Sequence, residues 1–359
     1  MGIRTEQPCG ILPRKPGVQG TQNMTRRGPE VKPQWRSLPQ EVRTHVEQAL
    51  GGKVRRATRA WGGYGPTPAY RLLLDDGRRV FFKGTSAHSN TFAQDALLRE
   101  ERIYQEIPDL LGRWAPRLHT AITVQDWHIL LIDDLGPPTV PPWSPTKTQA
   151  ITHELAAFHQ STMDKPFPAW LTRPDEQLAQ ESWEKTAHAS QEFQTIAALA
   201  GSQADEAQAW FHQFTPRIEQ AMHTPALRTG PFALLHGDLR SDNLRCIQGH
   251  VYLFDWPAAT IGRPEWDMVA FAQSIAVEAG PPPEQVLAWY AERFSFRARD
   301  LEEALVWWLT FFAERAWRAE IPGLPRLRRF QRQQLATMIA WLARHWLLPH
   351  PTWVEALLR

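Results

Sequence analysis

The sequence is poor in cysteine and in long apolar runs, and both shortages restrict what the protein can be. Of the 359 residues only Cys9 and Cys246 are cysteines, too few for a disulfide framework, which fits a reducing compartment. The longest apolar patch, residues 305–309, is too short to span a bilayer. No apolar stretch follows the first basic residues, so a signal peptide is not predicted. We therefore expect a cytoplasmic protein without a membrane partner.

Net charge is also small, at +2, and it is unevenly distributed. Residues 1–59 carry 12 Lys and Arg against 4 Asp and Glu, so the rest of the chain is acidic overall. Nucleic acid is therefore not expected as a partner. Residues 1–33 are rich in Pro, Gly, Arg and Thr without periodicity, and we predict a disordered leader there. Met24 is a second possible start of translation.

Apolar and aromatic residues are abundant: 43% of the chain is apolar, with 17 Trp and 16 Phe. A chain of this length can bury a large core and is expected to form two lobes. Apolar residues at every fourth position predict a helix over residues 38–50, ended by two glycines. Residues 54–61, 69–74 and 80–82 are predicted strands, and the last two are joined by an Asp-Gly turn.

Residues 234–244 read Leu-Leu-His-Gly-Asp-Leu-Arg-Ser-Asp-Asn-Leu, and a second apolar strand soon follows and ends at Asp255. The polar turn after the first apolar run presents Asp238 and Asn243. Phosphoryl transfer from a nucleoside triphosphate needs a carboxylate that orients the acceptor hydroxyl and hard oxygen ligands for magnesium. Asp238 is the predicted base, and Asn243 and Asp255 are the predicted metal ligands. Asp and Asn also cap ordinary turns, so the order and spacing of the whole set carry this prediction.

Lys83 ends an apolar strand, where a lysine either faces solvent or neutralises a bound phosphate. The second role requires a carboxylate partner. Residues 91–107 have a helical pattern in which Glu100 shares the apolar face, and a charge there is costly unless it is paired. Glu100 is therefore the predicted partner of Lys83, and Glu101, one step round the helix, is expected to be solvated.

The order His-Gly-Asp-Leu-x-x-x-Asn, an apolar strand and then Asp-Trp resembles the catalytic core of the aminoglycoside phosphotransferase and choline kinase family, which is related to the protein kinases. The resemblance covers roughly residues 55–275. It implies a two-lobed protein-kinase-like fold of the α+β class, with a small antiparallel β lobe carrying one helix and a larger, mainly helical lobe. Five prolines within residues 136–145 mark the expected boundary. We predict a nucleotide-binding lobe at residues 34–134 and a catalytic, acceptor-binding lobe at residues 135–359.

The same resemblance implies ATP and Mg²⁺ as cofactors, with GTP left open as the nucleotide and the number of magnesium ions undecided. Lys83 would contact the α and β phosphates. The other implied nucleotide contacts are a glycine loop over the phosphates and a main-chain segment beside adenine: Gly63, Gly65, Ile132, Asp133 and Asp134.

Residues around the motif have predicted supporting roles. Arg240 would stabilise developing charge on the transferred phosphate, or it pairs with Asp242 on the surface. His236 is expected to bond the main chain near Asp255, and Asp267 is expected to cap a helix and brace the loop.

The predicted activity is transfer of the γ-phosphate to a hydroxyl of a small molecule. Residues 135–300 hold 12 Lys and Arg against 19 Asp and Glu, which suits a cationic acceptor such as an aminoglycoside. Macrolides, amino alcohols, sugars and amino-acid hydroxyls stay open as acceptors, and the sequence does not indicate an oligomeric state. The alternative is a catalytically silent pseudokinase or scaffold. A protein kinase is disfavoured, because about 11 residues between Asp255 and Asp267 leave no room for a long activation segment.

Overall fold

The computed structural model describes residues 32–61, 67–174, 190–223, 228–321 and 324–358. Its small lobe is built on a five-stranded sheet with the order β1-β2-β3-β5-β4, in which every neighbouring pair is antiparallel. The strands are β1 (Val54–Arg59), β2 (Ala69–Leu74), β3 (Arg79–Ser86), β4 (Leu118–Val124) and β5 (Trp127–Asp133).

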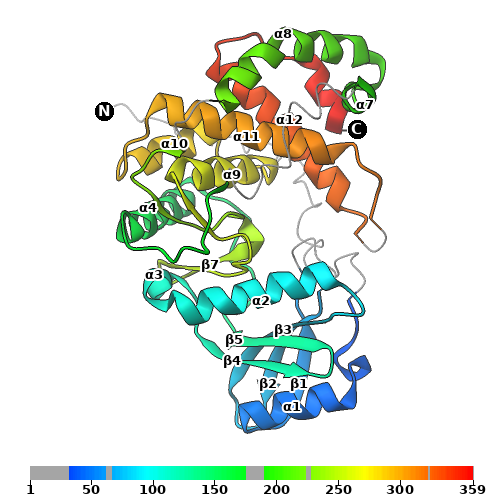
Figure 1. The fold of residues 1–359 in the computed structure, drawn as a ribbon, viewed down its shortest axis with the longest axis vertical. Helices are drawn as coiled ribbons and strands as arrows, with labels where there is room; N and C mark the ends of the chain where they lie inside the picture. The colour runs from blue at the N-terminus through cyan, green and yellow to red at the C-terminus, as the bar shows by residue number, and fades with distance from the viewer. Residues whose placement is uncertain (1–31, 62–66, 175–189, 224–227, 322–323, 359) are drawn as a thin grey trace, which may run out of the picture.

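Two helices lie on opposite faces of this sheet, α1 (Gln40–Leu50) on one and α2 (Thr91–Glu106) on the other (Figure 1). The sequence explains the α1 side, because Val42, Val46 and Leu50 recur every fourth residue and are all buried. Alternate residues of β2 and β3, such as Tyr70 and Phe82, are buried on the same side. The opposite face of β2 and β3 is only partly buried, and it carries Lys83.

Strand β3 is longer than its apolar pattern predicts. It continues through the polar residues to Ser86 and pairs with β5 from Val80 to Ser86, so Lys83 lies within the strand opposite Leu130. A strand interior holds a side chain more rigidly than a strand end does, because hydrogen-bonded neighbours lie on both sides.

The large lobe is mainly helical. Its helices are α4 (Pro145–Thr162), α7 (Ser190–Ala198), α8 (Ala204–Met222), α9 (Pro264–Val277), α10 (Pro283–Ala291), α11 (Ala298–Ala316) and α12 (Leu327–His345), whereas the short α3 (Pro108–Leu111) follows α2 within the first 134 residues. Two short antiparallel pairs lie at its end nearest the small lobe, formed by β6 (Ala233–Leu235) with β9 (Thr260–Gly262) and by β7 (Leu244–Ile247) with β8 (His250–Leu253). This is the α+β arrangement of two lobes that the sequence predicts.

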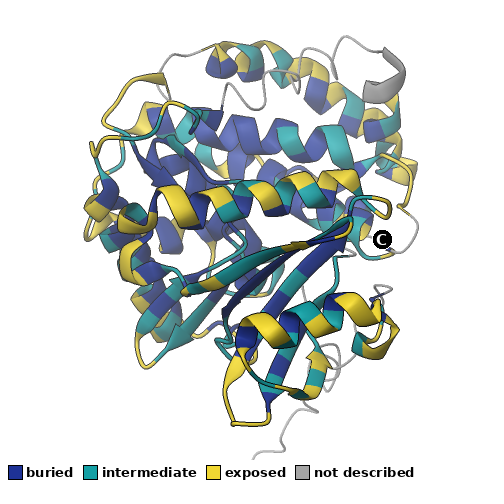
Figure 2. Cartoon of the chain, turned by 60° about the horizontal axis from the view of Figure 1, so that its bottom comes forward, coloured by how far each residue is buried: buried dark blue, intermediate teal, exposed yellow. Residues whose placement is uncertain are grey.

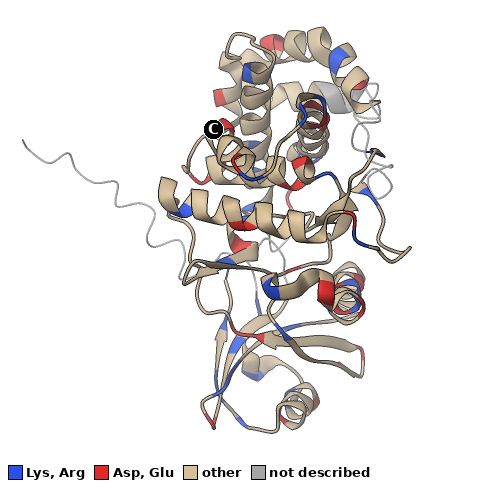
Figure 3. Cartoon of the chain, turned by 90° about the vertical axis from the view of Figure 1, so that its left-hand side faces the viewer, with Lys and Arg blue, Asp and Glu red and all other residues tan. Residues whose placement is uncertain are grey.

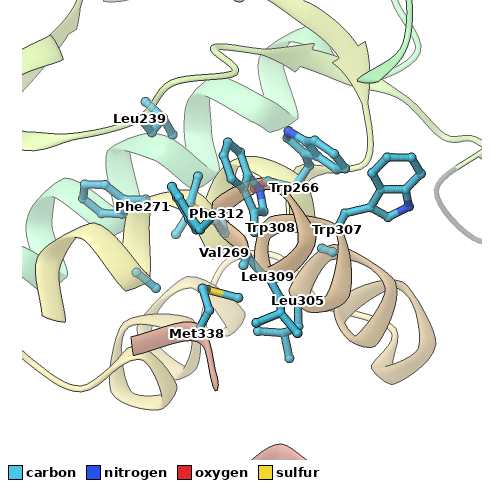
Figure 4. Close-up of a cluster of buried hydrophobic side chains, with 14 of the residues drawn as sticks. Leu239, Trp266, Val269, Phe271, Leu305, Trp307, Trp308, Leu309, Phe312 and Met338 are labelled. Atoms are coloured by element: carbon cyan, nitrogen blue, oxygen red, sulfur yellow. The ribbon is translucent and has the colours of Figure 1, made fainter. Parts of the chain in front are cut away.

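Most tryptophans in the described part of the large lobe are buried. Figure 4 shows Trp266 of α9 beside Trp307 and Trp308 of α11, and the indole N–H of Trp308 donates to the carbonyl of Trp266 at 2.9 Å. Leu239, next to the predicted base, is fully buried at the edge of this cluster. The burial pattern in Figure 2 follows the same division, with α9 largely buried and α1 exposed on its outer side. Within the described residues, no helix is long and apolar enough to cross a membrane.

Candidate active site

Residues 236–243, here named the Asp238 loop, connect β6 with β7 and are fixed by one buried carboxylate. Asp267 of α9 accepts hydrogen bonds from the backbone N–H groups of His236 at 2.6 Å and Gly237 at 2.8 Å. Gly237 has a φ of +78°, and a Cβ at this position would lie 2.2 Å from the carbonyl oxygen of Ala258. Only glycine fits so close a backbone contact, which explains the His-Gly pair of the motif.

The prediction that Asp267 caps a helix is wrong, whereas its predicted bracing of the loop is confirmed. Helix α9 begins at Pro264, and its N-cap residue is Arg263 without a side-chain cap. A proline at the first helical position fixes the start of the helix four residues earlier than we expected. Asp267 therefore lies inside the helix, where it also meets Nε2 of His159 at 3.3 Å.

His236 is buried between its own Asp238 loop and the segment that carries Asp255. Its Nε2 is 3.0 Å from the carbonyl oxygen of Phe254, and the backbone N–H of Asp238 points at its Nδ1 at 3.3 Å. Burial lowers the pKa of His236, with nearby carboxylates opposing the shift. A neutral ring that donates from Nε2 and accepts at Nδ1 satisfies both contacts. The predicted main-chain contact near Asp255 is confirmed.

Asp238 is positioned by two neighbours in its own loop. Its Oδ2 accepts from Nδ2 of Asn243 at 2.9 Å, and its Oδ1 lies 3.0 Å from Nε of Arg240. Arg240 also lies 3.5 Å from Asp242, the partner predicted for it on the surface, although its side chain is 16% exposed; its role at the transferred phosphate stays a prediction. Partial removal from water raises the pKa of the Asp238 carboxyl, and the positive charge of Arg240 opposes that shift.

Asn243 and Asp255 provide oxygen atoms suited to a hard cation. The side-chain amide of Asn243 donates from Nδ2 to both the carbonyl oxygen and Oδ2 of Asp238, which leaves its Oδ1 as the acceptor atom. Asp255 follows β8 with a positive φ of 68°, an uncommon conformation for a residue with a side chain. No group of three His, Cys, Asp or Glu ligands occurs in the described ranges. The donor set therefore fits magnesium held partly by phosphate oxygens rather than by a complete protein cage.

Lys83 joins the two lobes. Its Nζ lies 2.5 Å from Oε2 of Glu100 on α2 and 2.5 Å from Oδ1 of Asp255 in the large lobe. Burial alone would lower the pKa of Lys83, but the two carboxylates reverse this effect and raise it. Burial would likewise raise the pKa of Asp255, yet Lys83 holds it below its usual range. The predicted contact between Lys83 and Glu100 is confirmed.

Glu100 also supports the strand end that carries Asp255. It is 1% exposed, and its Oε1 accepts a long hydrogen bond of 3.4 Å from the backbone N–H of Trp256. The prediction that Glu101 is solvated is wrong in part, because its side chain is only 21% exposed. Its carboxylate lies 2.9 Å from Nε2 of buried His128, because the helix turns that residue back toward β5.

The segment predicted to contact adenine closes β5. The backbone N–H of Asp133 is already used, because it donates to the carbonyl of Arg117 at 3.0 Å. Asp134 directs its carboxylate inward, accepting from Nε of Arg71 at 2.8 Å and from the backbone N–H of Gly136 at 3.0 Å. Ile132 is buried between β3 and β4. The predicted phosphate-loop residues Gly63 and Gly65 lie outside the described residues.

Sequence reasoning missed a set of contacts that fastens α2 to the large lobe. The guanidinium of Arg99 donates to the carbonyl of Ala259 at 2.9 Å, four residues after Asp255. The guanidinium of Arg102 lies 4.2 Å from the ring centroid of Trp170, whose indole N–H donates to Glu106 at 2.5 Å. These side chains resemble an ordinary solvated helix face in the sequence, so no local signal reveals them.

A second missed residue, Glu278, connects the Asp238 loop to the lobe boundary. Its carboxylate accepts from the hydroxyl of Ser241 at 2.5 Å and from the indole N–H of Trp143 at 2.7 Å. Burial raises the pKa of Glu278, and these two hydrogen bonds oppose the shift. The Asp238 loop is thereby supported at both of its ends.

Comparison with known families identifies the sequence pattern around this site. Residues 57–303 match the family described as the phosphotransferase enzyme family. Comparison with curated protein sequences finds no match.

Solved structures share the fold at low sequence identity. A spectinomycin phosphotransferase in complex with ADP and spectinomycin is 12% identical with a TM-score of 0.55, and the match covers 89% of this chain and 97% of that one. An aminoglycoside phosphotransferase from Alicyclobacillus acidocaldarius is 15% identical with a TM-score of 0.53, covering 82% and 92%. An amicoumacin kinase in complex with AMP-PNP and Ca²⁺ is 12% identical with a TM-score of 0.51, covering 81% and 92%. The predicted protein-kinase-like fold is confirmed.

Proposed function

The chain belongs to the phosphotransferase enzyme family, and from this premise we propose that it is an ATP-dependent small-molecule kinase that phosphorylates a hydroxyl group. The observation that carries the proposal is the meeting at one point of Lys83 from β3, Glu100 from α2 and Asp255 from the other lobe. A buried ammonium between two carboxylates is costly to assemble. The Lys83 cluster lies beside the Asp238 loop, and a role in catalysis would explain why the protein maintains so costly an arrangement.

We propose that residues 34–134 form the nucleotide-binding lobe and residues 135–359 the catalytic and acceptor-binding lobe. The nucleotide would lie between them. Lys83, held by Glu100, would neutralise the α and β phosphates, and the main chain of residues 132–134 would face the base. The solved kinase and phosphotransferase with bound AMP-PNP and ADP support a nucleotide in this fold.

Asn243 and Asp255 would hold Mg²⁺. Mg²⁺, when bound there, would supply positive charge that reduces the negative charge of the phosphate oxygens. The side chains that bind it are already oriented, because Asn243 is fixed by Asp238 and Asp255 is fixed by Lys83.

Asp238 would act at the acceptor. Its carboxylate would accept the proton of the acceptor hydroxyl while that oxygen attacks the γ-phosphorus, and the bond from this phosphorus to the β-γ bridging oxygen would break to release ADP. Arg240, 3.0 Å from the same carboxylate, would stabilise charge that develops on the transferred group. The positive charge of Arg240 also favours the ionised form of the Asp238 carboxylate, which proton acceptance requires.

The charge balance of the large lobe and the activities of proteins with similar folds support a proposal for the acceptor class. The acidic balance of residues 135–300 favours a cationic or neutral hydroxyl compound over one that is already phosphorylated. Acidic and basic residues are intermixed along the ribbon of both lobes (Figure 3). The spectinomycin and aminoglycoside phosphotransferases among similar folds support an antibiotic-like acceptor. Amino alcohols and sugars fit the same chemistry.

The test is ATP consumption by the purified protein with Mg²⁺, screened across aminoglycosides, macrolides, amino alcohols and sugars. Asp238→Ala serves as the blank, and nucleotide affinity is measured in parallel. Turnover with one acceptor that falls by about 10²-fold or more in the blank, at unchanged nucleotide affinity, supports the proposal. Nucleotide binding without turnover across the panel supports the pseudokinase alternative, and turnover that survives Asp238→Ala removes this residue as the base.

A further inference from the structure

Arginine is concentrated at the junction where α11 ends and α12 begins. Residues 314–332 contain only two acidic residues, Glu314 and Glu320, against six arginines at positions 315, 318, 326, 328, 329 and 332. Residues 135–300 have the opposite balance, with 19 Asp and Glu against 12 Lys and Arg. The two helices pack against each other (Figure 1), so arginines of both helices can meet at the junction. The proposed phosphoryl transfer uses none of them.

Two arginines of α12 reach across to the end of α11. Nε of Arg328 donates to the carbonyl of Ala319 at 2.9 Å, and Nε of Arg332 donates to the carbonyl of Ala316 at 3.3 Å. Nη1 of Arg328 donates to Oε1 of Gln331 at 2.7 Å. All three acceptors are neutral. Neither guanidinium forms an ion pair with a carboxylate in the described part of the chain.

Two further arginines lie at the end of α11 and share one carboxylate. Nη1 of Arg315 is 2.9 Å from Oε2 of Glu314, and Arg318 forms an ion pair with the other oxygen of this glutamate. Both oxygens of Glu314 are therefore occupied, and this glutamate does not neutralise the arginines of α12. We name these four residues the arginine cluster: Arg315, Arg318, Arg328 and Arg332.

The positive charge of Arg328 is buried without a counter-charge. The residue is 8% exposed, and buried arginines are normally paired with a carboxylate because an isolated buried charge is costly. Burial lowers the pKa of Arg328, and the positive charges of Arg318 and Arg315 add to this shift. Nη2 of Arg328 and both Nη atoms of Arg332 make no hydrogen bond within the described ranges. The cluster thus has unneutralised charge and unused donors.

The start of α12 adds to the positive potential at the junction. This helix of 19 residues begins at Leu327, and its N-cap residue, Arg326, has no side-chain cap. The positive end of the helix dipole therefore lies one residue from Arg328. Capping of the last α11 carbonyls explains the two Nε contacts, but it leaves the Nη donors without a purpose. Guanidinium forks beside a helix start are suited to the oxygens of a phosphate group.

We propose that the arginine cluster binds the phosphate group of a small molecule, at a site separate from the nucleotide. Free Nη groups of Arg328 and Arg332 would donate to the phosphate oxygens, and Arg318, 44% exposed, would approach from the solvent side. The burial of Arg328 admits a small ligand rather than a macromolecular surface. An occupied site would stabilise the junction of α11 and α12. The inference does not depend on the kinase proposal, because it uses none of the residues assigned to phosphoryl transfer.

The first experiment measures the unfolding temperature during a titration with inorganic phosphate, with sodium chloride at equal ionic strength as the reference. The Tm of the parent should rise by about 2 °C at a phosphate concentration about ten times the dissociation constant. Arg332→Met should weaken phosphate binding about tenfold or more, because charge-assisted hydrogen bonds are lost. Glycerol phosphate is titrated in parallel. A response to glycerol phosphate at lower concentration than to inorganic phosphate identifies a phosphate ester as the preferred source, and the reverse order identifies the free ion.

Arg328→Met separates ligand binding from a purely structural role. If Arg328 carries an unneutralised charge, its removal abolishes the phosphate response and leaves the Tm in phosphate-free buffer unchanged or higher. A lower Tm together with an intact phosphate response would show that this arginine only caps α11, and it would overturn the proposal. If Arg328→Met does not fold, Arg332→Met decides, because Arg332 is only half-buried.

Two controls place the response on the molecule. Arg344→Met removes an arginine from the other end of α12, where it pairs with Glu284 at 2.7 Å, and the phosphate response should be unchanged. The response should also persist in Lys83→Met. Loss of the response in Lys83→Met would place the phosphate at the nucleotide site and overturn the proposal, as would a parent whose Tm responds equally to phosphate and to chloride.

Discussion

Nζ of Lys83 and Oδ1 of Asp255 lie 2.5 Å apart, although 172 positions separate them in the sequence and they belong to different lobes. With Glu100 also 2.5 Å from the same ammonium, the cluster holds two carboxylates and one cation. Its net negative charge matches the addition of a divalent metal ion that arrives with a nucleotide. The same contact links the two lobes, and we expect nucleotide binding to exchange one partner of Lys83 rather than to assemble the site.

Lys83→Met should therefore weaken nucleotide binding and turnover together. The substitution removes the cation between Asp255 and Glu100, whose carboxylate is 1% exposed. Breaking a buried ion pair from one side costs about 3 kcal/mol of the free energy of unfolding, which urea denaturation measures. Adding Glu100→Gln should restore part of that stability without restoring activity.

Lys53→Met is the matched control for this prediction. Lys53 also pairs with a glutamate, Glu47 at 2.8 Å, but its side chain is 76% exposed. Exposed pairs contribute little to stability, so affinity, turnover and denaturation midpoint should stay near those of the parent. Equal behaviour of the two lysine variants would show that Lys83 has no special part in nucleotide binding.

Asp267→Asn should destabilise the Asp238 loop. The aspartate accepts from two backbone N–H groups, of His236 and Gly237, and is fully buried. Asparagine has one carbonyl oxygen, so its NH₂ group would face one of these donors. Loss of a charge-assisted hydrogen bond in a buried site costs about 2–3 kcal/mol of unfolding free energy.

The rate should fall together with stability in this variant, because Asp238 lies one residue beyond the anchored pair. Turnover assays measure the rate, and urea denaturation measures the free energy of unfolding. Asp205→Asn, an exposed position at the start of α8, is the control and should change neither. A variant with normal stability and normal turnover would mean that the two backbone hydrogen bonds are dispensable.

The sequence predicts what depends on short-range pattern. The four-residue spacing of Val42, Val46 and Leu50 defines α1, and one charge on an apolar helix face identifies Glu100 as the partner of Lys83. The motif around Asp238 brings its own residues together because they lie within eight positions of each other. These features need only helix and strand periodicity and the cost of an unpaired buried charge.

The contacts that the sequence does not predict are long-range and made by ordinary surface residue types. Arg71 meets Asp134 across 63 positions, and Arg99 meets Ala259 across 160. A lone arginine on a strand or helix carries no periodic signal that names its partner. Asp267 was misassigned for a related reason: an acidic residue near a helix start commonly caps it, and only the tertiary position of the Asp238 loop shows that it binds another segment.

The pH dependence of turnover should report the ionisation of Asp238. The base acts as a carboxylate, so the rate falls as pH drops through its pKa. Because its surroundings raise that pKa, the acid limb of kcat/KM should lie at higher pH than an ordinary aspartate gives. Arg240 lowers the pKa of Asp238, so Arg240→Gln should move the limb to still higher pH, and Arg240→Lys should move it less.

The ionisation of Asp238 also affects the stability of the fold. The rate rises as this carboxyl loses its proton, whereas its contribution to stability falls. A carboxyl whose pKa is raised by folding adds stability below its unfolded pKa, and this contribution is lost as pH rises through the folded pKa. Asp238→Asn should therefore unfold at an equal or higher temperature than the parent near neutral pH, and the difference should disappear in acid. If neither Arg240 variant moves the acid limb of kcat/KM, that limb reports the ionisation of a group other than Asp238.

Trp170→Leu should loosen α2 and reduce nucleotide affinity without touching the nucleotide. Trp170 binds Arg102 through its ring and Glu106 through its N–H, and Arg99 holds the same helix to Ala259. Glu100 lies between these attachments, so its position opposite Lys83 depends on them. We expect faster hydrogen exchange of α2 amides, a several-fold higher KM for nucleotide and a nearly unchanged KM for the acceptor.

Arg113→Leu is the control. The Arg113 guanidinium also lies over an aromatic ring, that of Trp114 at 4.6 Å, but among the interactions described this guanidinium makes no contact with α2. If α2 exchange accelerates while the nucleotide KM stays constant, the Lys83–Glu100 pair holds its geometry without help from the large lobe.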